Sequence, residues 1–97
     1  MPTDKQKQPR AAMRQRVLKA GKILPPGNMS IVDCVIRDMS LTGARLAAGD
    51  QVAIPNEFRL VVLQDDTIRC AEVVWRRGDL IGVRFTSEPR RAPPRKR

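Results

Sequence analysis

The sequence predicts an all-β protein: a small six-stranded antiparallel β-barrel with basic, largely disordered tails at its N- and C-termini. Two observations support this fold class. Short runs rich in Val, Ile and Leu alternate with turn signals roughly every 8–12 residues, as in small sandwiches and barrels. No long segment shows the period of about 3.6 residues that marks an amphipathic helix. Closing such short strands into a barrel would also hide their edges from other chains.

The composition limits what the protein can do. A chain of 97 residues accommodates one small domain. Histidine is absent, which removes the commonest general base and the commonest metal ligand. We therefore expect no enzyme, no catalytic residue, no metal site and no cofactor. No apolar run approaches about 18 residues and none follows a basic start, so we expect no transmembrane segment or secretory signal, and a cytoplasmic protein.

The two cysteines, Cys34 and Cys70, each lie within an apolar strand pattern and far from any Cys-x-x-Cys spacing. We expect both to be reduced core residues, with a disulfide as the less favoured alternative.

The net charge of +9 is concentrated at the ends of the chain. Residues 1–22 carry a net charge of +6 and residues 89–97 a net charge of +5, whereas residues 23–88 carry −2. A domain that binds duplex nucleic acid through its own surface usually carries a basic face. We therefore expect no specific nucleic-acid partner, although the tails could attract nucleic acid or anionic membrane without sequence preference.

In chain order, the first half begins with a polar, proline-bounded stretch over 1–9 that we expect to be disordered. Residues 10–16 could form one helical turn or an extended arm. Strands follow over 17–24, 30–37 and 44–47. The first two are separated by a Pro-Pro-Gly-Asn turn.

The second half predicts three more strands, over 57–63, 68–76 and 80–85. Their patterns place Phe58, Leu60 and Val62 on one face, and Ile81, Val83 and Phe85 on one face. Gly78-Asp79 suits a two-residue hairpin loop with glycine first, as a type II′ turn prefers. From residue 89 the chain is a basic, proline-rich tail, so the domain is expected over 10–88.

The stretch Asp38-Met39-Ser40-Leu41-Thr42-Gly43 separates the second and third predicted strands. Residues i and i+2 of a strand share a face, so Asp38 and Ser40 are expected to point together off one outward face. Gly43, which has no Cβ, would allow another molecule or backbone to come close, or would adopt a positive φ. The alternative is an ordinary turn in which Asp38 and Ser40 bond to nearby backbone.

A second motif, Arg10-Ala11-Ala12-Met13-Arg14, precedes the first strand. The order and spacing of Arg-x-x-x-Arg and Asp-x-Ser-x-x-Gly resemble the signature of the PilZ domain family. The strand pattern is similar too, with Val-Val-Trp-Arg-Arg at 73–77 and a closing Gly-Val-Arg-Phe at 82–85. The resemblance covers roughly residues 10–86.

This resemblance implies a receptor for the bacterial second messenger cyclic di-GMP that signals to a partner protein without catalysis. Arginine forks hold phosphate oxygens or guanine edges, the role implied for Arg10 and Arg14. Asp38 would accept hydrogen bonds from guanine N1–H and N2–H, Ser40 would add a directed bond, and Gly43 would give clearance. Arg16 occupies the position directly before the first strand, where many members carry the second arginine, so it is a third contact or a substitute.

Two other functions stay open. One is a degenerate PilZ-like module that binds a protein and no nucleotide. The other is an oligonucleotide-binding barrel that uses the basic tails, which the presence of only three aromatic residues disfavours. Trp75 is expected to pack in the barrel or at its rim rather than to stack on a ligand. Members of the family often end in a C-terminal helix at the barrel mouth, where this chain has only its basic tail. The mouth could therefore be open or filled by a partner, and a homodimer is also left open.

Overall fold

A computed structural model describes residues 15–27, 30–49 and 53–92, with the backbone alone for residues 15–17. Within these ranges the chain forms strands only, and no helix there is long and apolar enough to cross a membrane. The strands are β2 (Gln15–Leu24), β3 (Val32–Met39), β4 (Gly43–Ala47), β5 (Glu57–Val62), β6 (Thr67–Arg77), β7 (Leu80–Phe85) and β8 (Arg90–Arg91).

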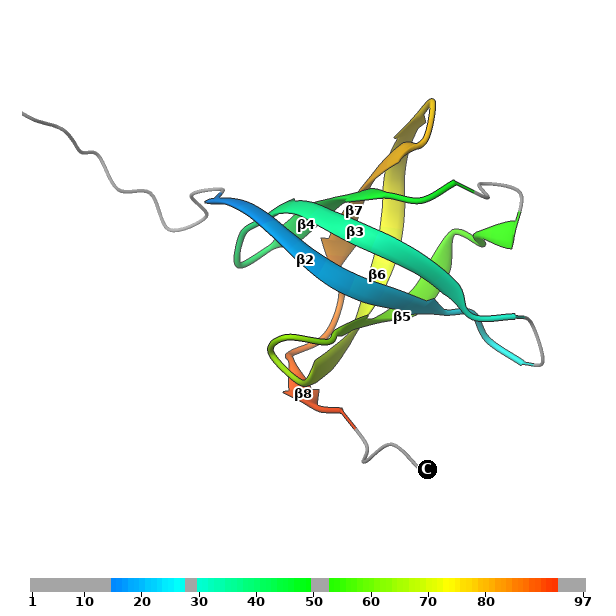
Figure 1. Cartoon of the computed structure of the whole chain (residues 1–97). Helices are drawn as coiled ribbons and strands as arrows, with labels where there is room; N and C mark the ends of the chain where they lie inside the picture. The colour runs from blue at the N-terminus through cyan, green and yellow to red at the C-terminus, as the bar shows by residue number, and fades with distance from the viewer. Residues whose placement is uncertain (1–14, 28–29, 50–52, 93–97) are drawn as a thin grey trace, which may run out of the picture.

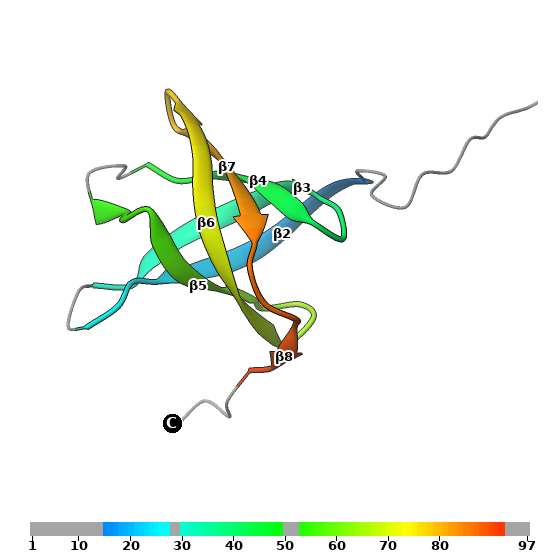
Figure 2. The same ribbon diagram turned by 180° about the vertical axis from the view of Figure 1, so that it is seen from behind.

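The strands form one antiparallel sheet in the order β5-β2-β3-β4-β7-β6-β8, and an additional β5–β6 pairing closes the first six into a barrel (Figures 1 and 2). The predicted six-stranded barrel is confirmed, and each predicted strand agrees with the observed one to within two residues at either end. Gly78 has a φ of 59°, whereas Asp79 does not have a positive φ, so the glycine-first hairpin turn is confirmed.

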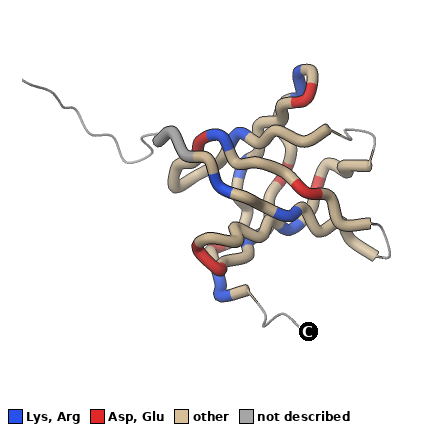
Figure 3. Tube along the Cα trace, in the orientation of Figure 1, with Lys and Arg blue, Asp and Glu red and all other residues tan. Residues whose placement is uncertain are grey.

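The core is mainly aliphatic, and five strands each supply one side chain with no exposed surface: Ile23, Ile36, Leu46, Leu60 and Ile81. Burying each such side chain contributes roughly 1.5–3 kcal/mol. The predicted alternation in β5 and β7 is confirmed, because every residue assigned to one face there is buried. Basic and acidic positions are interspersed over the strands (Figure 3), in keeping with the net charge of −2 over residues 23–88.

The prediction that both cysteines lie in the core is right for Cys34 and wrong for Cys70. Cys34 is 6% exposed and belongs to the core cluster, whereas Cys70 is exposed; both thiols are free. The reason is which face of β6 points into the core at this position. Cys70 is the Cα partner of the exposed residue Arg59, whereas the neighbouring Ala71 is 2% exposed and faces the core.

The structure differs from prediction at the C-terminal end, where residues 90–92 join the sheet. β8 pairs with Thr67 and Ile68 of β6, and the Ala92 N–H donates to the Asp66 carbonyl at 2.9 Å. β7 ends at Phe85, so it leaves the first residues of β6 without a neighbour on that side. The chain returns there and satisfies the exposed backbone groups.

Candidate functional site

The turn between β3 and β4 is held together by Ser40. Its backbone N–H donates to the Gly43 carbonyl at 2.8 Å, and its Oγ accepts from the N–H groups of Thr42 and Gly43, each at 3.2 Å. The turn interpretation of Ser40 is therefore confirmed. Its hydroxyl proton has only long contacts, 3.3 Å to Thr42 Oγ1 and 3.4 Å to the Gly43 carbonyl. These are weak hydrogen bonds, so the hydroxyl retains the capacity to donate to a ligand.

Gly43 permits a close approach of backbone rather than an unusual backbone conformation. A Cβ at this position would lie 2.3 Å from the carbonyl oxygen of Val83 in β7. The positive φ that the sequence left open does not occur here. Gly43 therefore allows β4 and β7 to pair directly beside the turn.

One row of residues crosses five strands next to this turn. Successive Cα partners run from β2 through β3, β4 and β7 to β6, in the order Arg16, Asp38, Arg45, Gly82 and Trp75. Arg45 stands between the buried residues Ala44 and Leu46, so the row follows the outer face of the barrel. Two basic positions and an acidic one thus lie in line with the tryptophan.

Asp38 was expected to be an outward, accessible carboxylate, and this expectation is wrong with respect to exposure. Asp38 is only 4% exposed, and its Oδ2 lies 2.8 Å from Nη2 of Arg45. A β-bulge between Ile36 and Asp38 shifts the register with β4 and aims Asp38 at Arg45. The carboxylate therefore holds a neighbouring guanidinium in place.

Trp75 was expected to pack, and it does so in a way that leaves part of its ring in solvent. A bulge between Val73 and Trp75 places Trp75 opposite Gly82. A Cβ on Gly82 would lie 2.1 Å from the indole Nε1, so the ring covers the glycine. The side chain is still 42% exposed. The glycine within the closing strand was the sequence signal for this arrangement, because aromatic residues often cover strand glycines.

A shallow depression of about 230 Å³ lies where the row meets the turn. Its lining includes Ser40, Gly43, Arg45, Trp75 and Arg84. Pockets for whole small-molecule ligands usually span ~300–1,000 Å³, so this depression has room for only one part of a ligand of that size. Arg45 Nε is buried and has no hydrogen-bond acceptor within the described ranges.

The family model of the PilZ domain matches residues 4–96, nearly the whole chain. The protein is a member of the PilZ domain family. The resemblance based on the two motifs is thereby confirmed. A comparison with curated protein sequences found no match. PilZ domains are a family of cyclic di-GMP receptors and adaptors that bind rather than catalyse.

In this PilZ domain the three predicted arginines are only partly placed. Arg10 and Arg14 lie outside the described residues. Arg16 is described by its backbone, which lies in β2 as the Cα partner of Asp38. Of the three, Arg16 is the arginine that the strand register sets beside the Asp-x-Ser-x-x-Gly motif.

The described part of the PilZ domain offers no metal centre. Within it, no three His, Cys, Asp or Glu side chains come together as a metal site would require. The polar groups of the row and the turn include arginines, a carboxylate and the hydroxyls of Ser40 and Thr42. Such groups bind anions and hydrogen-bonding rings.

Proposed function

We propose that this PilZ domain binds cyclic di-GMP on the outer face that carries the row from Arg16 to Trp75, and passes the signal to a partner protein. The observation that carries the proposal is the row itself. It aligns arginine positions with a half-exposed indole beside the motif turn. A ligand with two phosphodiester charges and two guanines matches both kinds of group.

The arginines supply the electrostatic part of this interaction. Guanidinium groups bind phosphate oxygens in bidentate fashion and also lie flat on purines. Arg45 is oriented for this role by its ion pair with Asp38. Arg10 and Arg14 precede β2 in the sequence and Arg16 lies at its start, so we propose that they clamp the ligand from the N-terminal side.

The remaining groups supply specificity. The Trp75 ring offers a face for a guanine, and Ser40 donates a hydrogen bond from the edge of the depression. In this proposal Asp38 acts on guanine only if the ligand displaces Arg45, so its first role is to position that arginine. This is a change from the direct contact that the sequence implied.

The test is isothermal titration of the chain with cyclic di-GMP, with GTP and a short single-stranded oligonucleotide as controls. Saturable binding at micromolar or lower concentrations to cyclic di-GMP alone is the expected result. Absence of heat together with unchanged amide NMR shifts would reject it. A second candidate would then take its place: a PilZ domain that binds only a protein. The Asp38–Arg45 ion pair favours this second candidate, because it already occupies the carboxylate.

A further inference from the structure

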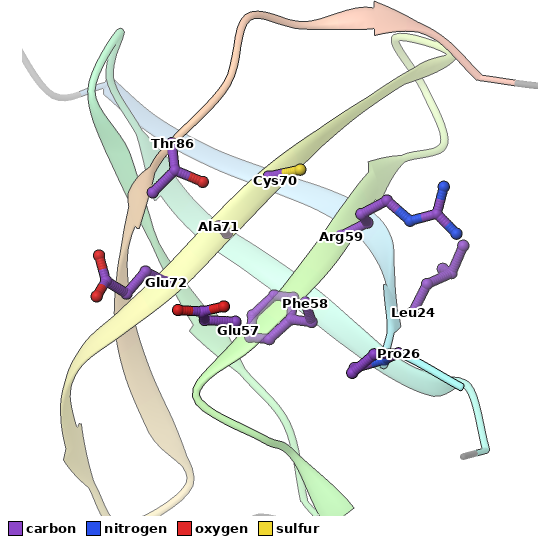
Figure 4. Close-up of a pocket in the computed structure, with 9 residues that line it drawn as sticks. All are labelled: Leu24, Pro26, Glu57, Phe58, Arg59, Cys70, Ala71, Glu72 and Thr86. Atoms are coloured by element: carbon purple, nitrogen blue, oxygen red, sulfur yellow. The ribbon is translucent and has the colours of Figure 1, made fainter. Parts of the chain in front are cut away.

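A second depression, of about 370 Å³, lies on the side of the barrel formed by β5 and β6 (Figure 4). Its apolar lining includes Leu24, Pro26, Phe58 and Ala71. No residue of the two sequence motifs lines it. The depression, hereafter the β5–β6 groove, is therefore a surface that the proposed nucleotide site does not use.

The β5–β6 groove has an acidic end. Glu57 and Glu72 are Cα partners on the two strands and both line the groove. Figure 4 shows their carboxylates together at one end, with Arg59 toward the other. Glu57 forms no ion pair within the described ranges. Like charges placed directly opposite each other in a sheet repel, so this end favours a cation.

Arg84 connects the β5–β6 groove to the candidate nucleotide site. It is the Cα partner of Gly43 and lines the depression beside the motif turn. On its other side its guanidinium is paired with Glu72. The Arg84 side chain is 60% exposed. Ion pairs this exposed are weak, whereas a bidentate bond between arginine and phosphate is strong, so a phosphate ligand can capture Arg84.

We propose that the β5–β6 groove docks a segment of a partner protein that carries a lysine or arginine beside an apolar side chain. We also propose that an anionic ligand at the candidate site strengthens this docking by drawing Arg84 away from Glu72. The coupling rests on the proposed function, whereas the docking does not.

Charge and shape together select this occupant. The cation of the segment lies between Glu57 and Glu72, and its apolar neighbour packs against Leu24 and Pro26, the apolar lining residues that are not buried in the core. When Arg84 turns to a phosphate, Glu72 loses its countercharge and the two carboxylates face each other. A cationic segment relieves that repulsion, so the two binding events favour each other, and the coupling is reciprocal.

The docking is tested by backbone amide NMR on the full chain, with the peptide acetyl-Leu-Pro-Lys-Arg-amide as probe and acetyl-Leu-Pro-Glu-Glu-amide as its control. The basic peptide should shift the amides of 57–59 and 70–72, and the acidic peptide should not. Glu57→Gln should weaken binding by about two- to fivefold, the range for an exposed ion pair. Glu88→Gln removes the same charge from an exposed position outside the groove and should leave binding unchanged.

The coupling is tested by Arg84→Gln and by adding cyclic di-GMP. Arg84→Gln should bind the basic peptide more tightly than wild type without nucleotide, and cyclic di-GMP should tighten peptide binding in wild type only. The docking is overturned if the two peptides shift the groove amides equally, or if neither wild type nor Arg84→Gln shows shifts of these amides. Nucleotide binding with unchanged peptide affinity overturns the coupling. A chain that binds the basic peptide and no nucleotide contradicts the proposed function and supports the docking.

Discussion

The indole of Trp75 occupies the space above Gly82 where a side chain at position 82 would lie. The ring thus rests on bare backbone of β7, and the bulge in β6 aims it there. This contact fixes the orientation of the only tryptophan in the chain at the edge of the proposed ligand site.

Gly82→Ala should destabilise the barrel by about 1–3 kcal/mol, because the added methyl group overpacks the site and displaces the indole. In a Trp75→Ala background the same substitution should cost little, since the space is then empty. Urea unfolding of the four proteins gives the interaction energy. An equal cost of Gly82→Ala in both backgrounds would show that the glycine is required for another reason.

Trp75→Ala should weaken cyclic di-GMP binding by about 1–3 kcal/mol, the range for loss of one stacked base. Binding should also change the fluorescence of the wild-type chain, whose emission comes from this residue alone. Val74→Ala is the matched control, because Val74 is exposed and lines the same depression without a ring. If Trp75→Ala binds cyclic di-GMP as tightly as wild type, Trp75 contributes to packing and not to ligand binding.

Asp38→Ala should lower the free energy of unfolding by about 1.5–3 kcal/mol, because it leaves Arg45 without its buried countercharge. Asp33→Ala is the control on the same strand. The Asp33 side chain is 79% exposed and pairs with Lys22, so its removal should cost at most about 1 kcal/mol. The measurement is urea unfolding by circular dichroism. Equal effects of the two substitutions would show that the Asp38–Arg45 pair contributes no more than a surface pair.

The sequence was sufficient to predict the barrel because the patterns that mark its strands and turns are local. Alternating apolar residues mark β5 and β7, and glycine-first chemistry marks the turn at Gly78. Both follow from the pleat of a strand and from backbone sterics, and neither depends on distant residues.

The sequence was not sufficient where a bulge changes which side chains share a face. The extra residue in β3 sets Asp38 against Arg45, and the one in β6 sets Trp75 against Gly82. A bulge depends on how two strands fit each other, so a single strand pattern does not reveal it. Cys70 was misplaced for a related reason, since an alternating apolar pattern does not say which of its two faces is inside.

The two thiols should differ in reactivity. Burial raises the pKa of Cys34 from 9.0 to about 12, with a further contribution from nearby Asp33. At pH 8 a disulfide reagent should therefore titrate only the exposed Cys70 in the native protein, and both thiols in denaturant. Rapid native reaction of two thiols would contradict the burial of Cys34.

The raised pKa of Cys34 also makes stability depend on pH. The folded state keeps the thiol proton where the unfolded chain releases it, so this contribution is complete below about pH 9 and is lost as the pH rises toward 12. Unfolding free energies measured between these limits should fall more steeply for wild type than for Cys34→Ala. If the unfolding free energies of the two proteins fall equally with pH, Cys34 is not responsible for the pH dependence.

Titrations of Arg10→Ala, Arg14→Ala and Arg16→Ala with cyclic di-GMP will show which arginine contributes most to the binding free energy. The motif spacing assigns the pair to Arg10 and Arg14, and the strand register sets Arg16 beside Asp38. We expect Arg14→Ala to lose about 1.5–3 kcal/mol of binding free energy, the range for hydrogen bonds to charged groups. Lys7→Ala, which removes one positive charge upstream of the motif, should have little effect. If Arg14→Ala binds like wild type and Arg16→Ala does not, the pair is shifted by two residues. Ala12 then occupies the position of the first arginine of the pair. In that case Arg16, beside Asp38, is the one arginine of the pair that binds the ligand.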